Sequence, residues 1–328
     1  LQVLALAALT VPDAWLSVPY VMAAQALSGI AKDLNKMSAK ASVKTLTRGG
    51  GESRLFRWVA VLTGSKNALK GAGFFVGAAL LETAGFRGAL AWLAGSLLLV
   101  LGLTAILLPH RLGQAKGKPK FTQVFSNTPA INWLSAARFF LFGSRDVWFV
   151  VGLPVFLYSV LEWRFIEVGA FLALWIIGYG FVQASAPRLL QYSHHGRGPG
   201  GGTARLWVSV LALIPAGIAL ALSQGWPAGP ILIAGLVVFG VVFAVNSAVH
   251  SYLILGYSDH DKVAMSVGFY YMANAGGRLI GTVLSGWAYQ TQGLEGCLWW
   301  SSGFLLLAAL LSVRLPEVDN GHTPADAV

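Results

Sequence analysis

Long runs without any charged residue recur along this chain, and they limit what it can fold into more than any other feature. A helix that crosses a lipid bilayer needs about 20 predominantly apolar residues. Runs repeated in this way predict a polytopic membrane protein of the all-α class. The five clearest runs are residues 89–108, 168–187, 206–222, 231–249 and 297–313.

Composition and motifs exclude most other classes of protein. Hydrophobic residues make up 56% of the chain and charged residues 11%, whereas soluble domains carry about 25% charged residues. The single Cys297 cannot form a disulfide within the chain, no Cys/His cluster has zinc-site spacing, and no protease, hydrolase or ATPase motif occurs. We therefore expect no metal, no cofactor and a secondary transporter rather than an enzyme.

The hydropathy pattern predicts one truncated apolar segment followed by complete spans. The chain begins without Met inside an apolar stretch, so we expect a fragment whose start has been removed. The expected segments are 1–11, 14–30, 58–81, 89–108, 131–161, 168–187, 206–222, 231–255, 263–289 and 297–313.

Lysine and arginine in the short loops indicate the orientation, because they collect on the cytoplasmic side. Sixteen lysine and arginine residues fall in or beside the expected loops of one membrane side, whereas the expected loops of the opposite side contain only Arg87 and Arg164. This bias predicts a multi-pass protein of the cell inner membrane, embedded in the lipid bilayer, with its C-terminus in the cytoplasm. It also accounts for most of the net charge of +10, which therefore does not indicate a nucleic-acid partner.

The distribution of spans suggests two bundles. Four expected spans precede a basic connector and six follow it, and many transporters consist of two six-helix halves. We predict a major facilitator-type helical bundle that lacks its first two helices. The expected parts are the remainder of an N-terminal bundle at 1–108, a cytoplasmic connector at 109–128, a C-terminal six-helix bundle at 129–315 and a cytoplasmic tail at 316–328.

Charged residues inside the expected spans are the main functional signal. Each cation costs about 2.5–3.5 kcal/mol to insert, so such residues usually face a bundle interior or an aqueous cavity. Because Asp146, the one acid well within a span, neutralises at most one cation, a surplus of positive charge remains. The five cations are Lys66, Lys70, Arg138, Arg145 and Arg278.

Spacing groups these cations on shared helix faces. Residues four or seven apart lie on one face, as do Lys66 with Lys70 and Arg138 with Arg145. Arginine forms bidentate bonds to phosphate-like groups and lysine acts as a compact point charge. The sequence therefore predicts a site for an anionic solute, with the substrate-binding candidates Lys66, Lys70, Arg138, Arg145, Asn274 and Arg278.

Structural roles compete with this interpretation. Arg145 and Asp146 are sequence neighbours, so we do not expect them to face one another, and each could pair with a different helix. Lys66 and Arg138 could instead extend toward the cytoplasmic edge of the membrane.

Neutral residues give weaker signals. Asn246 and His250 could line the cavity or move a proton, although a hydrogen bond between helices is the commoner role of such a pair.

Glycines are expected to serve packing and turns. The pairs Gly73 with Gly77 and Gly277 with Gly281 permit close helix contact. Residues 196–201 match the dinucleotide-binding pattern GxGxxG by spelling, but no strand precedes them, so we expect a flexible basic loop.

Four stretches of the chain resemble the ArsJ family of organoarsenical efflux permeases, which belongs to the major facilitator superfamily. They are residues 18–40, 62–71, 134–138 and 143–149. The resemblance implies export of 1-arseno-3-phosphoglycerate, which a glyceraldehyde-3-phosphate dehydrogenase forms from arsenate, and hence arsenate resistance with that dehydrogenase as a functional partner. Such a solute carries an arsenate and a phosphate group, which matches a cavity with surplus cations.

Alternating access is the expected mechanism, with Asp146 and His250 as candidate proton carriers for antiport. Other interpretations stay open. The first is a transporter or antiporter of organophosphates such as phosphoglycerate. The second is an exporter of hydrophobic cations, which the positive charge of the expected cavity disfavours. The third is a non-transporting sensor or assembly subunit.

Overall fold

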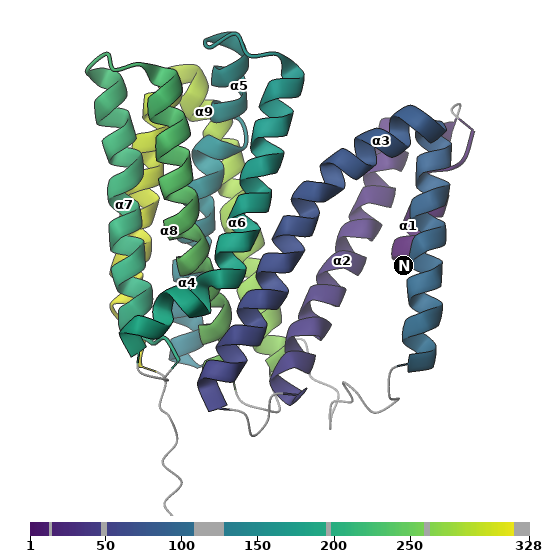
Figure 1. Cartoon of the computed structure of the whole chain (residues 1–328), viewed down its shortest axis with the longest axis horizontal. Helices are drawn as coiled ribbons and strands as arrows, with labels where there is room; N and C mark the ends of the chain where they lie inside the picture. Colours follow the sequence, from purple (N-terminus) through teal and green to yellow (C-terminus); the bar gives the residue numbers. More distant parts are fainter. Residues whose placement is uncertain (13–14, 47–50, 108–127, 195–197, 259–262, 318–328) are drawn as a thin grey trace, which may run out of the picture. The chain divides into compact units, whose positions relative to one another are not determined.

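Every regular element in the described residues is an α-helix (Figure 1). The computed structural model describes residues 1–12, 15–46, 51–107, 128–194, 198–258 and 263–317. The helices are α1 (Gln2–Ala8), α2 (Val18–Leu46), α3 (Gly51–Leu107), α4 (Pro129–Phe149), α5 (Gly152–Ser159), α6 (Phe165–His194), α7 (Gly201–Ser223), α8 (Ala228–Gly256) and α9 (Val263–Ser312). The all-α prediction is confirmed.

The chain forms two compact units. Unit 1 contains residues 1–46 and 72–118, and unit 2 contains residues 47–71 and 119–328. The first part of α3 therefore belongs with the C-terminal helices, although it lies within the predicted N-terminal bundle of residues 1–108. The expected connector falls almost wholly on residues 108–127, outside the described residues. The division into two bundles stays a prediction.

Six helical stretches of the described chain are long and apolar enough to cross a membrane. They are 79–107, 129–159, 166–190, 201–223, 228–256 and 263–312. The predicted segments 1–11, 14–30 and 58–81 are not among them. The first is reduced to the seven residues of α1, which are too few for a span. In the other two segments, polar and charged side chains lower the mean hydropathy.

Two pairs of predicted spans are each joined into one continuous helical element. Segments 58–81 and 89–108 form α3, which kinks at Gly85, and segments 263–289 and 297–313 form α9, which kinks at Gly293. Both glycines have positive φ, 66° and 68°, a conformation that costs glycine no steric penalty. At about 1.5 Å per residue, the 50 residues of α9 exceed the roughly 30 Å of a hydrocarbon core, so α9 holds the two predicted spans.

The predicted span 131–161 breaks into α4 and α5. At the start of α4 the Thr128 Oγ1 accepts a hydrogen bond from the Ile131 N–H at 3.5 Å, and Pro129 follows it, an arrangement that favours helix initiation. At the break, the Gly152 N–H donates to the Ser285 Oγ of α9 at 3.2 Å. The amide at the start of α5 is thereby satisfied inside the bundle.

The stretch between the expected segments 14–30 and 58–81 is mostly helical among its described residues. The helix α2 runs on to Leu46, so Lys32 and the lysines after it lie on a helix. In unit 1, α1 and α2 are held by the Gln2 Nε2, which donates to the Ser28 Oγ at 2.8 Å, and by the Tyr20 hydroxyl, which donates to the Ala8 carbonyl at 2.6 Å.

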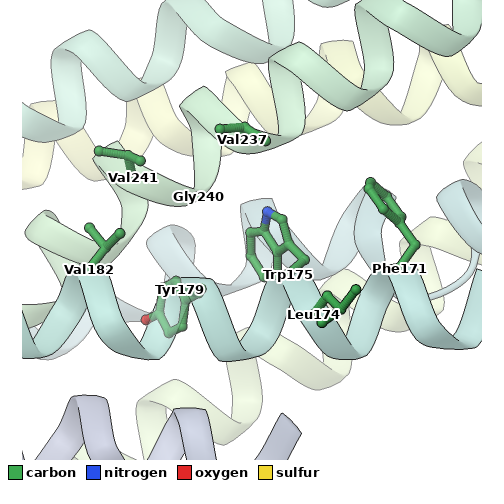
Figure 2. A pocket seen from close by; sticks show the side chains of 9 residues that line it. Phe171, Leu174, Trp175, Tyr179, Val182, Val237, Gly240 and Val241 are labelled. Atoms are coloured by element: carbon green, nitrogen blue, oxygen red, sulfur yellow. The ribbon is translucent and has the colours of Figure 1, made fainter.

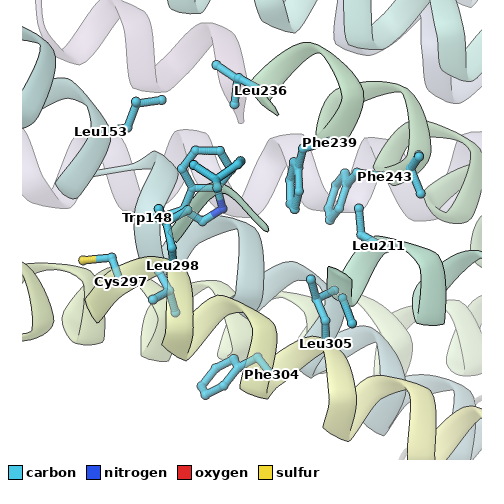
Figure 3. Close-up of a cluster of buried hydrophobic side chains, with 14 of the residues drawn as sticks. Trp148, Leu153, Leu211, Leu236, Phe239, Phe243, Cys297, Leu298, Phe304 and Leu305 are labelled. Atoms are coloured by element: carbon cyan, nitrogen blue, oxygen red, sulfur yellow. The ribbon is translucent and has the colours of Figure 1, made fainter. Parts of the chain in front are cut away.

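The core of unit 2 contains buried apolar side chains from each of the helices α4 to α9 (Figure 3), and aromatic pairs join α4 to α8 within it. Trp148 meets Phe239 edge-on with ring centroids 5.2 Å apart, and Phe142 meets Phe243 at 5.1 Å. Such pairs add about 0.5–1.5 kcal/mol to the burial of their area. This core fixes the face of α4 that carries Arg138, Arg145 and Asp146.

Glycines bring α4 and α9 into backbone contact. A Cβ at Gly281 would lie 2.5 Å from the Gly143 carbonyl oxygen, and one at Gly277 would overlap the Phe139 carbonyl. The predicted packing role of Gly277 and Gly281 is confirmed. Within the described residues, a Cβ at Gly73 or Gly77 would meet nothing within 4 Å, so the same prediction is wrong for that pair.

The glycine-rich stretch before α7 is a packed turn, which corrects the expected flexible loop. Residues 195–197 lie outside the described part, but Gly200 and Gly201 are buried. The Gly202 N–H donates to the Glu317 Oε1 at 2.9 Å and the Gly201 N–H donates to the Pro316 carbonyl at 3.2 Å. Any side chain at Gly200 would overlap Glu317, so the glycines make room for the chain that follows α9.

The end of α8 joins the same contact. The Tyr257 hydroxyl donates to the Pro316 carbonyl. Burial raises the pKa of the Tyr257 hydroxyl, and the nearby Glu317 carboxylate adds to this effect, so the phenol keeps the proton that it donates. The ends of α7, α8 and α9 are thus tied together.

Candidate anion site

Two arginines share one carboxylate inside unit 2. The Arg278 Nε donates to the Asp146 Oδ2 at 2.7 Å, and the Arg145 Nε donates to the Asp146 Oδ1 at 2.7 Å. The Asp146 side chain is 0% exposed, that of Arg145 is 15% exposed and that of Arg278 is 45% exposed. These three residues, the Asp146 cluster, carry a net charge of +1 with their most exposed group at Arg278.

The prediction that Arg145 and Asp146 do not face one another is wrong. Their Cα atoms are adjacent on α4, but the long arginine stem lets the guanidinium fold back onto its neighbour, with the Nη2 also 2.5 Å from the Asp146 Oδ1. The second carboxylate oxygen is then available to Arg278 on α9. One acid therefore orients two arginines, although it cancels only one of their charges.

Arg138 lies in a separate polar cluster with neutral partners. Its Nε donates to the Asn274 Oδ1 at 3.1 Å, and its Nη1 donates to the Ser247 Oγ at 3.2 Å. Its guanidinium carbon lies 3.7 Å from the centre of the Phe142 ring, a cation–π contact. Arg138 is 4% exposed and does not extend to the membrane edge. Arg138, Asn274 and Ser247 are called the Arg138 cluster below.

Two neutral amides extend the Arg138 cluster and were not predicted from the sequence. The Gln183 Nε2 of α6 donates to the Ser247 Oγ at 3.1 Å, and the Asn67 Nδ2 of α3 donates to the Gln183 Oε1 at 2.6 Å. A search restricted to charges overlooks both. The presence of a glutamine within the uncharged run 168–187 is the signal that could have found Gln183.

The two lysine candidates lie on the part of α3 that belongs to unit 2. Lys66 and Lys70 have exposed side chains. This part of α3 packs closely on α6, since a Cβ at Gly71 would lie 2.5 Å from the Ile177 Cγ1 and one at Gly180 would lie 2.6 Å from the Gly64 carbonyl oxygen. All six substrate-binding candidates therefore occur in one compact unit.

Comparison with solved structures identifies the fold. The chain is similar to the human organic anion transporter MFSD10 (TETRAN), with a TM-score of 0.74 and 19% identity over 95% of this chain and 74% of that one. It is also similar to a bacterial homologue of the iron transporter ferroportin in an outward-facing state, with a TM-score of 0.75 and 15% identity over 95% of this chain and 80% of that one. This is a major facilitator-type fold. No family model and no curated protein matches the sequence.

The predicted polytopic membrane protein is thereby confirmed at the level of the fold. At 15–19% identity the similarity does not identify a cargo, and the candidate residues rest on the geometry of this chain alone.

The predicted polar pair on α8 is enclosed in the transporter fold without hydrogen bonds. Asn246 and His250 are 0% and 1% exposed, and none of their side-chain nitrogen or oxygen atoms has a hydrogen-bond partner among the described residues. The expected hydrogen bond between helices is therefore not formed. A buried polar group left in this condition costs about 1–3 kcal/mol.

A groove in unit 2 is lined by apolar and aromatic side chains. It runs between α6 and α8, has a volume of about 310 Å³ (Figure 2) and is lined by no charged side chain. The Trp175 Nε1 donates to the Leu236 carbonyl at 2.8 Å and is not offered to a solute. The lining residues are Phe171, Leu174, Trp175, Gly178, Tyr179, Val182, Val237, Gly240 and Val241.

No metal centre is evident in the described part of the chain. It contains no group of three or more His, Cys, Asp or Glu side chains that could hold a metal ion.

Proposed function

We propose that this protein is a membrane efflux transporter that exports an anionic organoarsenical, 1-arseno-3-phosphoglycerate, by alternating access and so confers arsenate resistance. The observation that carries the proposal is the Asp146 cluster, in which two guanidinium groups share one buried carboxylate and Arg278 is 45% exposed. A net positive cluster with a partly exposed guanidinium suits an oxyanion and opposes a cationic solute.

The cargo comes from the resemblance to the ArsJ family rather than from geometry. A glyceraldehyde-3-phosphate dehydrogenase would supply the solute as the functional partner. The similarity to the human organic anion transporter MFSD10 agrees with a negatively charged cargo. We place the protein in the cell inner membrane with its C-terminus in the cytoplasm.

The candidate residues have graded roles in this proposal. Arg145, Arg278 and Lys70 hold the oxyanion groups, with Lys66 assisting. Arg138 and Asn274 assist indirectly, because they are bonded to one another.

Asp146 competes with the cargo for the same arginine donors, since both are anionic oxygen acceptors. Loss of its charge would raise the net charge of the Asp146 cluster from +1 to +2. Asp146 is therefore the first candidate for a proton carrier in antiport, and His250 is the second.

Arsenate resistance of cells that co-express the dehydrogenase tests the proposal. Arg278→Gln removes a charge-assisted hydrogen-bond donor, worth about 1.5–3 kcal/mol, so we expect at least a tenfold weaker affinity for the cargo and loss of resistance at unchanged membrane abundance. Arg164→Gln is the matched control, because Arg164 is an exposed arginine that pairs with Glu167 in the first turn of α6. Wild-type resistance in the Arg278→Gln cells would refute the site.

A transporter or antiporter of ordinary organophosphates such as phosphoglycerate is the alternative, because the same cluster suits phosphate and carboxylate groups. Uptake of labelled 3-phosphoglycerate into everted vesicles separates the two. Strong uptake without arsenate resistance would favour the alternative.

A further inference from the structure

A continuous chain of hydrogen bonds crosses unit 2 from α3 to α9. The Asn67 Nδ2 donates to the Gln183 Oε1, the Gln183 Nε2 donates to the Ser247 Oγ, and Arg138 donates to both Ser247 and Asn274. The bonds are 2.6, 3.1, 3.2 and 3.1 Å long. Five helices, α3, α6, α8, α4 and α9, each contribute one side chain, and these five side chains are called the relay below.

The direction of the bonds in the relay follows from chemistry. A guanidinium only donates, so Ser247 and Asn274 must accept from Arg138. With the Gln183 amide nitrogen also directed at Ser247, the Gln183 oxygen is left to accept from Asn67. Gln183 and Ser247 are 0% and 1% exposed, so neither exchanges these partners readily for water.

Both ends of the relay lie beside cations of the proposed cargo site. Asn67 follows Lys66 directly and precedes Lys70 by three residues, within one helical turn. At the other end Asn274 precedes Arg278 by four residues, on the same face of α9. The relay therefore begins within one helical turn of the lysine pair of α3 and ends about one turn from Arg278 of the Asp146 cluster.

The packing around the relay leaves little room for α3 and α6 to slide past one another. A Cβ at Gly71 would lie 2.8 Å from the Ala173 carbonyl oxygen, and a Cβ at Gly180 would lie 2.8 Å from the Ala68 Cα. Asn67 and Gln183 thus meet across a seam in which α3 and α6 are already in backbone contact.

We propose that the relay sets the separation between the lysine pair and the arginine pair, so that the site selects an anion with a charged group at each end. Gln183 and Asn67 are positioning residues in this scheme, because they act through the cations that they hold in place. The inference rests on the proposed function and adds to it a criterion for cargo selection.

Two test solutes that differ by one charged group report on this selection. Competition for transport in everted vesicles is measured with 3-phosphoglycerate, which has a phosphate and a carboxylate, and with glycerol 3-phosphate, which has the phosphate alone. We expect the unaltered protein to prefer 3-phosphoglycerate about tenfold, equivalent to one further ionic contact of about 1.4 kcal/mol.

Variants at the two relay amides remove the preference if the proposal is right. Gln183→Leu and Asn67→Ala each raise the KM for 3-phosphoglycerate about tenfold and leave that for glycerol 3-phosphate within about twofold. The double variant is no worse than the more severe single variant, because both break one chain of bonds. Ser65→Ala is the matched control on α3, since the Ser65 Oγ donates to the Leu62 carbonyl of its own helix.

Equal rises of KM for both solutes, a fall in maximal rate alone, or additive effects in the double variant would overturn the proposal. Asn67 is only partly buried, so its variant keeps the test open if Gln183→Leu does not fold.

Thermal unfolding separates this inference from the proposed function. If the unaltered protein gives no arsenate resistance and binds neither solute, the proposed function fails, and the selection criterion fails with it. The unfolding temperatures of Gln183→Leu, Ser247→Ala and their double variant still show whether the relay exists. A non-additive loss supports it, and an additive loss refutes it.

Discussion

Two arginine clusters of unit 2 differ in the kind of partner that holds each cation. In the Arg138 cluster a 4% exposed guanidinium is surrounded by neutral acceptors and an aromatic ring. In the Asp146 cluster a buried carboxylate holds two guanidinium groups, and Arg278 stays half exposed. The difference teaches that arginines within the apolar stretches of one chain divide into a cation enclosed by neutral partners and a cation that stays partly exposed.

The largest effect that can test this comparison is expected at the Asp146 carboxylate. Asp146→Asn leaves two guanidinium groups side by side without a counter-charge, and breaking a buried ion pair costs about 3–5 kcal/mol. Because Arg278 is partly solvated, we expect the lower end of this range, measured as thermal unfolding in detergent micelles. Adding Arg278→Gln should restore part of the loss, since one uncompensated charge is then removed.

The exposed pair Arg164 with Glu167 is the control for this experiment. Glu167→Gln should change stability little, because both side chains of this pair are exposed, at 77% and 45%, and solvent screens such pairs. A loss at Asp146 no larger than the loss at Glu167 would contradict the assignment.

The glycine seam between α4 and α9 supports both clusters, because each has a hydrogen bond across it. Gly277→Ala overpacks the seam against the Phe139 carbonyl and should cost about 1–3 kcal/mol. Gly73→Ala should be neutral or stabilising by up to about 1 kcal/mol, because Ala favours helix more than Gly does. Equal effects of the two substitutions on the unfolding temperature would show that the seam is not tight.

Thiol labelling sharpens the comparison most directly. A membrane-impermeant reagent should modify the cysteine of Arg278→Cys at least about tenfold faster than that of Ser247→Cys, because buried thiols are inert. The native Cys297 is buried and serves as the internal unreactive standard when labelling is read by mass spectrometry. Equal rates at positions 278 and 247 would place both clusters in the same environment.

The sequence by itself determined the fold class, the spans after residue 128 and the cations worth attention. These follow from local properties: uncharged runs of membrane length, and charges that cost free energy within them. It also identified Gly277 and Gly281 as a contact face, since their four-residue spacing is visible without knowledge of the partner helix.

Only the tertiary structure decided which partner each cation contacts. Asp146 and Arg278 are 132 residues apart, and Asn67 and Gln183 are 116 apart, so no local pattern indicates either contact. Neutral amides also carry no charge signal, which is why the relay was not predicted. The partner of a side chain depends on how helices pack, and that packing brings distant residues together through the shapes of whole helix faces.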